Sequence, residues 1–133
     1  MKKVLLLLAL LGTTSLVANE EGNKDAIKKS MQSMEMSMSF IQKGFLYNHR
    51  GRIKKGITSL RRELKRIDMF MIKNDKDVQF NAKEYAIAET KALDLMASRI
   101  LEDFDKGNKE AVMIEFQQVL NRCVTCHALV RRW

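Results

Sequence analysis

The residues most informative about the fold are Asn108–Val130, NKEAVMIEFQQVLNRCVTCHALV, near the carboxyl end of the chain. The apolar residues of this stretch recur in alternating steps of four and three, which keeps them on one face and predicts an α-helix. Asn108 is the expected N-cap, and Glu110 places a negative charge in the first turn, where it suits the helix dipole. The inward stripe comprises Val112, Phe116, Val119, Cys123, Cys126 and Val130.

The same spacing recurs twice in the first half of the chain, which contains no proline. It predicts one helix over Lys24–Asn48, with Asn23 as the N-cap, and a second over Arg52–Lys73. The outer face of the second helix is strongly basic. The two inward stripes are Ile27, Met31, Met34, Met38, Ile41 and Phe45, and then Ile53, Ile57, Leu60, Leu64, Ile67 and Met71.

A remaining helix is predicted from Asn81 to the Lys106–Gly107 end, because Asn81 and Glu84 have capping-box spacing and glycine commonly follows a helix end. Four helices with short connections predict an all-α, antiparallel up-down-up-down four-helix bundle. The core side of this helix comprises Ala82, Ala86, Leu93, Met96, Ile100 and Phe104.

The amino end has the pattern of a secretory signal peptide over residues 1–18: two lysines, a short leucine-rich run and small residues. We expect cleavage after Ala18, with Ser15 as the alternative, and a bundle domain over residues 19–133. The apolar run is shorter than the roughly 20 residues that a membrane-spanning helix needs. We therefore expect an exported, soluble periplasmic protein without stable membrane insertion, and export argues against a nucleic-acid partner.

The only two cysteines form Cys123-Val124-Thr125-Cys126-His127, the C-x-x-C-H signature of c-type haem attachment. The two thiols would add to the haem vinyl groups as thioethers. Positions i and i+3 on a helix bring both sulfurs to one side, and His127 shares that face as the proximal iron ligand. The predicted cofactor is therefore one covalent haem c.

Two other types of site use the same kinds of residue. A thioredoxin-like dithiol would lie at the start of a helix in a βαβ context, which this chain lacks. A zinc site needs four ligands, whereas Cys123, Cys126 and His127 supply three and His49 is the only other histidine. His49 falls in the predicted first turn, far from His127, and is expected to be a surface residue.

A C-x-x-C-H motif near the end of the last of four helices resembles the class II c-type cytochromes, the cytochrome c′ family. Arg131, four residues after His127, matches the basic residue common in that family. It is a candidate contact for the haem propionates, with a solvated basic end as the alternative. The resemblance also implies a homodimer through the first two helices, which the charged face of the second helix opposes.

The first helix forms the distal side of the haem in that family, with methionine in low-spin members and an apolar residue in high-spin members. Met31 is the first candidate for a sixth iron ligand and Met34 the second, while core packing of both would leave the iron five-coordinate. The same methionines, together with Met36 and Met38, also resemble the thioether arrays that bind Cu(I).

The function expected from these features is single-electron transfer between redox partner proteins. The alternatives are a five-coordinate haem that binds NO or CO, and a methionine-rich copper protein. The formal net charge of +8, or +6 once Lys2 and Lys3 leave with the leader, suits acidic partners, although it also serves solubility. No paired carboxylates or nucleophile–base arrangement stands out, so an enzyme is not expected.

Overall fold

The computed structural model describes the backbone of residues 2–70, 72 and 81–131, and the side chains of residues 20–70, 72 and 81–130. Within these residues the chain forms four α-helices and no strand, which confirms the predicted all-α four-helix bundle. The elements are α1 (Lys2–Leu46), α2 (Arg50–Leu64), a short 3-10 helix η1 (Ile67–Met69), α3 (Ala82–Asp105) and α4 (Lys109–Arg131).

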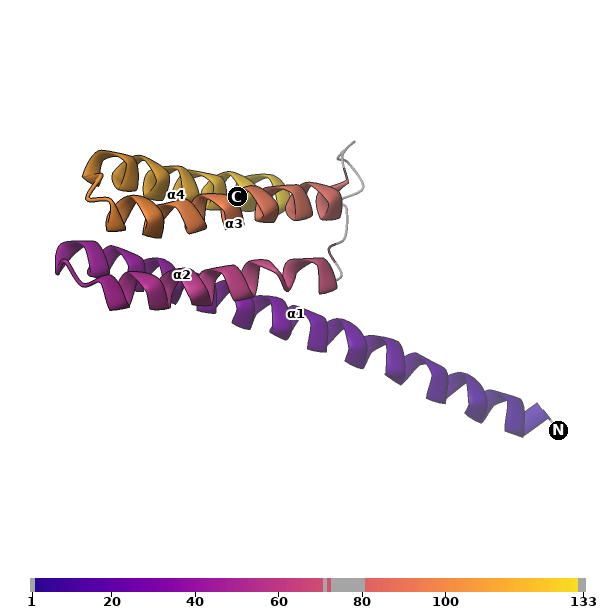
Figure 1. Cartoon of the computed structure of the whole chain (residues 1–133). Helices are drawn as coiled ribbons and strands as arrows, with labels where there is room; N and C mark the ends of the chain where they lie inside the picture. The colour runs from indigo at the N-terminus through magenta and orange to yellow at the C-terminus, as the bar shows by residue number, and fades with distance from the viewer. Residues whose placement is uncertain (1, 71, 73–80, 132–133) are drawn as a thin grey trace.

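Consecutive helices pair as two antiparallel hairpins, α1 with α2 and α3 with α4, and α2 joins the two hairpins by packing on α3. Figure 1 shows the hairpins as two layers, with the first part of α1 extending beyond the other helices. Among the described residues, α1 and α4 contact each other far less than either contacts its hairpin partner. This leaves a seam between α1 and α4, and the candidate site lies along it.

Two groups of buried side chains hold the bundle together. The main core contains residues from all four helices, and a smaller cluster of Ile67, Phe70 and Ala86 lies where η1 meets α3. Burying one Leu or Ile side chain stabilises the fold by about 1.5–3 kcal/mol, so the main core supplies most of the cohesion. Its members are Ile41, Ile53, Ile57, Leu60, Leu64, Leu93, Ala97, Ile100 and Val119.

Small residues let α1 and α2 approach each other closely. A Cβ atom added to Gly56 would lie 2.7 Å from the backbone oxygen of Ser37 and 2.7 Å from Cγ1 of Ile41. Gly44 is similarly placed against Ile53. The Ser37 atom in this contact belongs to the backbone and the Ile41 side chain is fully buried, so neither has free space to move away.

We expect Gly56→Ala to lower the free energy of unfolding by about 1–3 kcal/mol, the usual cost of overpacking a tight contact. Thermal or denaturant unfolding measures the change. Gly22→Ala is the matched control, because nothing lies within 4 Å of a Cβ at Gly22 and alanine favours the helix. A Gly56→Ala variant as stable as the parent would contradict the close packing of α1 on α2.

The predicted start of the first helix is wrong. Asn23 lies inside α1, which begins at Lys2, because the leucine-rich segment favours helix and no proline separates it from the rest of α1. The other end is near the prediction: α1 stops at Leu46, and Asn48 takes a left-handed backbone conformation with φ of 48°. Within the described residues, no helix combines the length and the apolar character needed to cross a membrane.

The predicted extent of the second helix is also wrong. It ends at Leu64 instead of Lys73, and the chain tightens into η1. The break places Phe70, which is outside the predicted stripe, in the smaller core cluster, where it is 5% exposed. Burial of this aromatic ring accounts for the end of α2 at Leu64 and the change to a 3-10 helix. Met71, the last residue of the predicted stripe, lies outside the described residues.

The predicted caps of the last two helices are confirmed. The side-chain oxygen of Asn81 accepts a hydrogen bond from the backbone N–H of Glu84 at 3.1 Å, and that of Asn108 accepts one from Ala111 at 3.2 Å. Gly107, which follows the end of α3, has a φ of 72°, a conformation that favours glycine.

Part of the basic face of α2 is not simply solvated, because it binds acidic residues of α3. Arg61 forms a bidentate ion pair with Asp94, at 2.7 and 3.0 Å, and Arg50 pairs with Asp105 in the same way at the turn end of the bundle. The Arg61 guanidinium lowers the pKa of the Asp94 carboxyl, chiefly through this hydrogen bond. These bridges link the two hairpins on the side opposite the α1–α4 seam.

Candidate functional site

The three residues of the attachment motif lie on one face of α4. Cys123, Cys126 and His127 are all partly buried and line the same cavity, whereas the two intervening residues, Val124 and Thr125, are exposed. No disulfide joins the two cysteines. The helical spacing therefore presents both sulfurs and the imidazole to one space, as the motif predicts.

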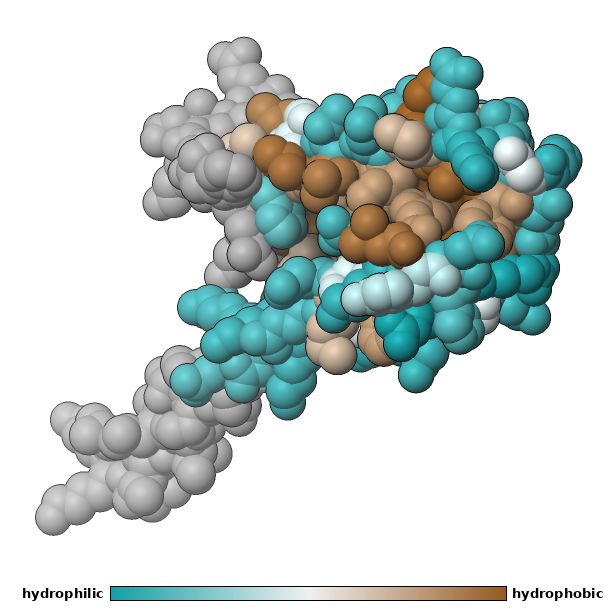
Figure 2. All heavy atoms as spheres, turned by 90° about the vertical axis from the view of Figure 1, so that its left-hand side faces the viewer, coloured by the Kyte–Doolittle hydropathy of each residue, from teal (hydrophilic) through white to brown (hydrophobic). Residues whose placement is uncertain are grey.

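The cavity has a volume of about 480 Å³, within the roughly 300–1,000 Å³ typical of cofactor sites. It lies between the two hairpins, with α1 on one side, α4 on the other, and residues of α2, η1 and α3 between them. Figure 2 faces the end of the molecule where α1 turns into α2 and α3 into α4, and shows an apolar area bordered by hydrophilic side chains there. The apolar lining of the cavity comprises Ile27, Met31, Met34, Leu64, Ile67, Ile72, Ala86, Leu93 and Val130.

Both predicted candidates for the sixth ligand line this cavity, from the wall formed by α1. Met31 packs only on the smaller core cluster, whereas Met34 also packs on the main core. Met38 packs on the main core and is not among the lining residues, and Met36 is 61% exposed on the outer side of α1. The helix therefore separates the four methionines, and only two of them face Cys123 and His127 across the cavity.

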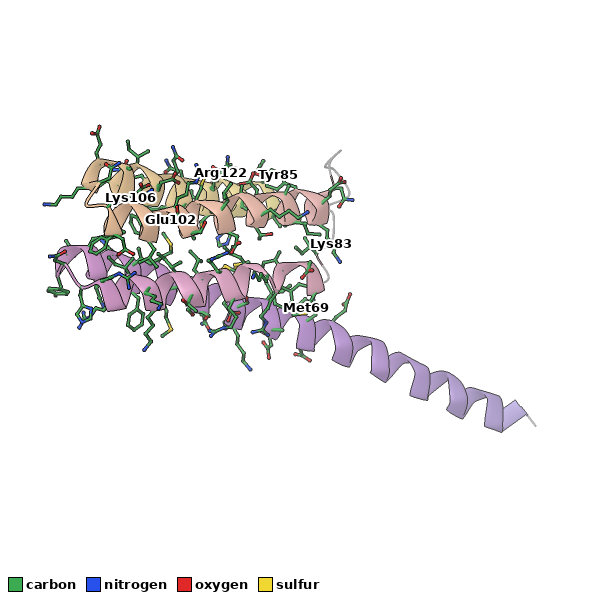
Figure 3. The ribbon with its side chains drawn as sticks, in the orientation of Figure 1. Met69, Lys83, Tyr85, Glu102, Lys106 and Arg122 are labelled. Atoms are coloured by element: carbon green, nitrogen blue, oxygen red, sulfur yellow. The ribbon has the colours of Figure 1, made fainter. Side chains whose placement is uncertain are left out.

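Three polar residues of the lining are not apparent from the sequence pattern: Lys24, Glu89 and Thr90. Glu89 on α3 forms an ion pair with Arg122 on α4, at 2.9 Å, next to Cys123 and Cys126. Figure 3 shows Tyr85 and Arg122 on these two neighbouring helices. Burial raises the pKa of the Tyr85 hydroxyl, with Glu89 and Cys126 adding to the effect. A position-by-position sequence pattern gives no signal for such pairs, since the partners are 33 residues apart.

The remaining predicted residues lie outside the cavity or outside the described side chains. Arg131 is the last residue of α4, and its side chain is not among those described. His49 is exposed and caps α2, its Nδ1 accepting a hydrogen bond from the backbone N–H of Arg52 at 3.2 Å. The prediction that His49 is a surface residue is confirmed. Among the described residues, no group of three or more His, Cys, Asp or Glu side chains forms a metal-ion cluster.

Other hollows in the surface do not coincide with the motif. A hollow of about 590 Å³ lies between α2 and α3, but charged residues such as Lys54, Arg62 and Glu102 line it, and neither cysteine does. The cavity at Cys123 combines apolar walls with the sulfur atoms of two cysteines and the imidazole of His127. We therefore take it as the candidate site.

Burial raises the pKa of the Cys123 thiol to about 11, with smaller contributions from Cys126 and Glu89. A thiol that stays protonated at neutral pH is a weak nucleophile for disulfide exchange, since the thiolate is the reactive form. The C-x-x-C pair also lies near the carboxyl end of α4, where the helix dipole does not favour a thiolate. Both features disfavour a dithiol redox centre.

In protein with both thiols free, we expect alkylation of Cys123 to be slow at pH 8 and to accelerate up to about pH 11. Because the folded-state pKa exceeds the unfolded one, this thiol contributes stability below about pH 9 that is lost as the pH rises through 11. Peptide mass spectrometry after timed iodoacetamide labelling measures the rate, with urea-unfolded protein as the control. Equal rates in folded and unfolded protein would contradict the burial of this thiol.

Comparisons with known protein families, curated proteins and solved structures find no match to this chain.

Proposed function

We propose that this chain is a monohaem c-type cytochrome of the class II kind that carries single electrons in the periplasm. The observation that carries the proposal is the cavity with Cys123, Cys126 and His127 on one wall and Met31 and Met34 on the other. A flat, apolar macrocycle with two reactive vinyl groups and a central iron matches that set of side chains.

Each part of the proposed site has a defined task. Cys123 and Cys126 would hold the haem covalently, and His127 would bind the iron. Met31 or Met34 would supply a thioether on the opposite side. A haem in this place supplies one-electron redox chemistry at its iron, and methionine ligation favours the reduced state. The apolar walls of α1 and α3 would exclude water, while the open side of the cavity leaves one edge accessible to a redox partner.

Export is the second part of the proposal. Haem attachment to C-x-x-C-H takes place outside the cytoplasm, so a signal peptide over residues 1–18 is a requirement of the proposed function. Removal after Ala18, or after Ser15, would leave α1 starting close to the segment that lines the cavity, where Lys24 is the first lining residue. The excess of basic residues on α2 suits an acidic redox partner.

A second candidate function is the binding of NO or CO at a five-coordinate haem. The observation that favours it is the apolar character of the wall opposite His127, where Ile27 and Ile67 flank the two methionines. If both methionines serve only to pack, the sixth position stays open in an apolar space. Small diatomic gases then have access, whereas charged ligands pay a high desolvation cost.

An absorption spectrum separates these functions. The full chain, expressed with its leader in a host that attaches haem, is measured oxidised and reduced, with and without CO. We expect sharp α and β bands on reduction, the weak far-red band of methionine ligation when oxidised, and no response to CO. Broad high-spin bands that shift with CO would favour gas binding. A protein without any haem band would overturn the proposal and leave copper or thiol chemistry.

A further inference from the structure

Glu63 is a buried carboxylate close to the cavity. It lies on α2 with only 3% of its surface exposed, directly before Leu64, which lines the cavity. A buried carboxylate is costly unless it is paired and hydrogen-bonded. The contacts of the Glu63 carboxylate therefore indicate its role in the structure.

Three donors satisfy the Glu63 carboxylate. The Ser30 hydroxyl donates to Oε2 at 3.0 Å, and Nη1 of Arg66 lies 3.2 Å from the same oxygen. Nε of Arg62 lies 3.2 Å from Oε1. The two arginines belong to the same stretch of chain as Glu63, whereas Ser30 belongs to α1. The Ser30 bond is therefore the one that crosses between helices, and Ser30 is itself 2% exposed.

This bond is formed at the level of the cavity. Ser30 directly precedes Met31, and successive side chains of an α-helix point about 100° apart. With Ser30 held against α2, Met31 and Met34 are turned into the cavity, which both of them line. The nearest close contact of α1 with α2 described above, Ser37 against Gly56, is 7 residues further along α1, or about 10 Å at 1.5 Å per residue. The Ser30–Glu63 bond is thus a separate support of α1 beside the site.

We infer that Glu63 is a positioning residue that, through Ser30, fixes the rotation of α1 and so holds a methionine in reach of the haem iron. The inference rests on the proposed function. On this inference, the Ser30–Glu63 pair, which lies outside the cavity, controls whether a methionine closes the sixth position of the iron. Loss of the pair would let α1 rotate or withdraw, and would open the iron to small ligands.

The test is the ligation state of the haem protein in Glu63→Ala, Glu63→Gln and Ser30→Ala. We expect Glu63→Ala to raise the fraction of reduced protein that binds CO at a fixed CO concentration by about tenfold, as expected when one hydrogen bond to a charged group is lost. The far-red methionine band should weaken in parallel. Glu63→Gln keeps an acceptor for Ser30 and should retain methionine ligation. Ser30→Ala leaves the arginine contacts intact and tests the same link if Glu63→Ala fails to fold.

The matched control is Glu115→Ala. Glu115 is a mostly buried carboxylate on α4 that pairs with Arg99, more than two helical turns before Cys123 and outside the cavity lining. Glu115→Ala should leave the response to CO unchanged. If Glu63→Ala and Ser30→Ala lose stability but keep the parental spectrum, the role of Glu63 is overturned and the electron-carrier proposal stands. A parent protein with attached haem but no methionine ligand would overturn both.

Discussion

A Cys123→Ser, Cys126→Ser double variant, expressed with residues 1–18 in a host that attaches haem, is expected to carry no covalent haem. A hydroxyl cannot replace a thiol in the proposed thioether bonds, and both thiols lie on the cavity-lining face of α4. Each single variant retains one possible thioether and should lose most of its covalent haem. The measurements are intact mass, haem staining after denaturing electrophoresis and the absorbance of the purified protein.

The controls for this prediction are Val124→Ser and Thr125→Ser. Both residues belong to the motif but are exposed on the outer side of α4, away from the cavity. We expect full haem attachment in both. His127→Ala should separate the two bonding modes, because it keeps both thiols and removes the proximal ligand. Haem that stays bound through denaturation in the double serine variant would refute the assignment of the site.

The sequence predicted the helices best where local chemistry determines them. Asn81 and Asn108 cap their helices as expected, because an N-cap depends on residues only three positions apart. The attachment motif is local in the same sense, since Cys123 and His127 are one helical turn apart. The start of α1 differs from the prediction because the leucine-rich segment continues the helix, and the end of α2 differs because packing decides it: Phe70 is buried against residues that are distant in the sequence.

Residues that function through distant partners gave no signal in the sequence. Ser30 and Glu63 read as surface positions in any hydrophobic pattern, yet both are buried because they satisfy each other across 33 residues of chain. By helix propensity alone, Gly44 and Gly56 would destabilise their helices, whereas in the structure they lie where α1 and α2 approach each other closely. The composition of the cavity walls could be anticipated from the apolar stripes, but its polar residues could not.

The two hairpins differ in what they contribute to the site. The α3–α4 hairpin carries the attachment motif and is tied together beside it by the Arg122–Glu89 ion pair. The α1–α2 hairpin carries the methionines and contacts α4 only weakly among the described residues. A cofactor bonded to α4 would therefore fill the seam between the hairpins, so haem attachment should also add to the stability of the bundle.

In the proposed haem protein, Met31→Leu is expected to replace methionine ligation with an open sixth site. Met31 lies in the middle of the α1 residues that line the cavity, which run from Lys24 to Met34. It packs only on the smaller core cluster, whereas Met34 packs on both clusters, so the thioether of Met31 takes less part in core packing. Leucine keeps the volume and the apolar character but cannot bind iron.

The measurable consequences are loss of the far-red methionine band, appearance of CO binding and a lower reduction potential. Axial ligands set haem potentials over a range of about 0.8 V, and loss of a single methionine should lower the potential on the order of 0.1 V. Met38→Leu is the matched control, because Met38 packs on the main core without lining the cavity. It should leave the spectrum and the potential unchanged.

Met34→Leu completes the comparison, since Met34 is the other methionine that faces His127 across the cavity. If Met31 binds the iron, Met34→Leu should keep methionine ligation and change only the stability of the core. The reverse pattern would assign the ligand to Met34 and leave electron transfer as the function. If neither substitution alters the spectrum and the parent protein already binds CO, the methionines only pack, and gas binding replaces electron transfer as the function that this cavity supports.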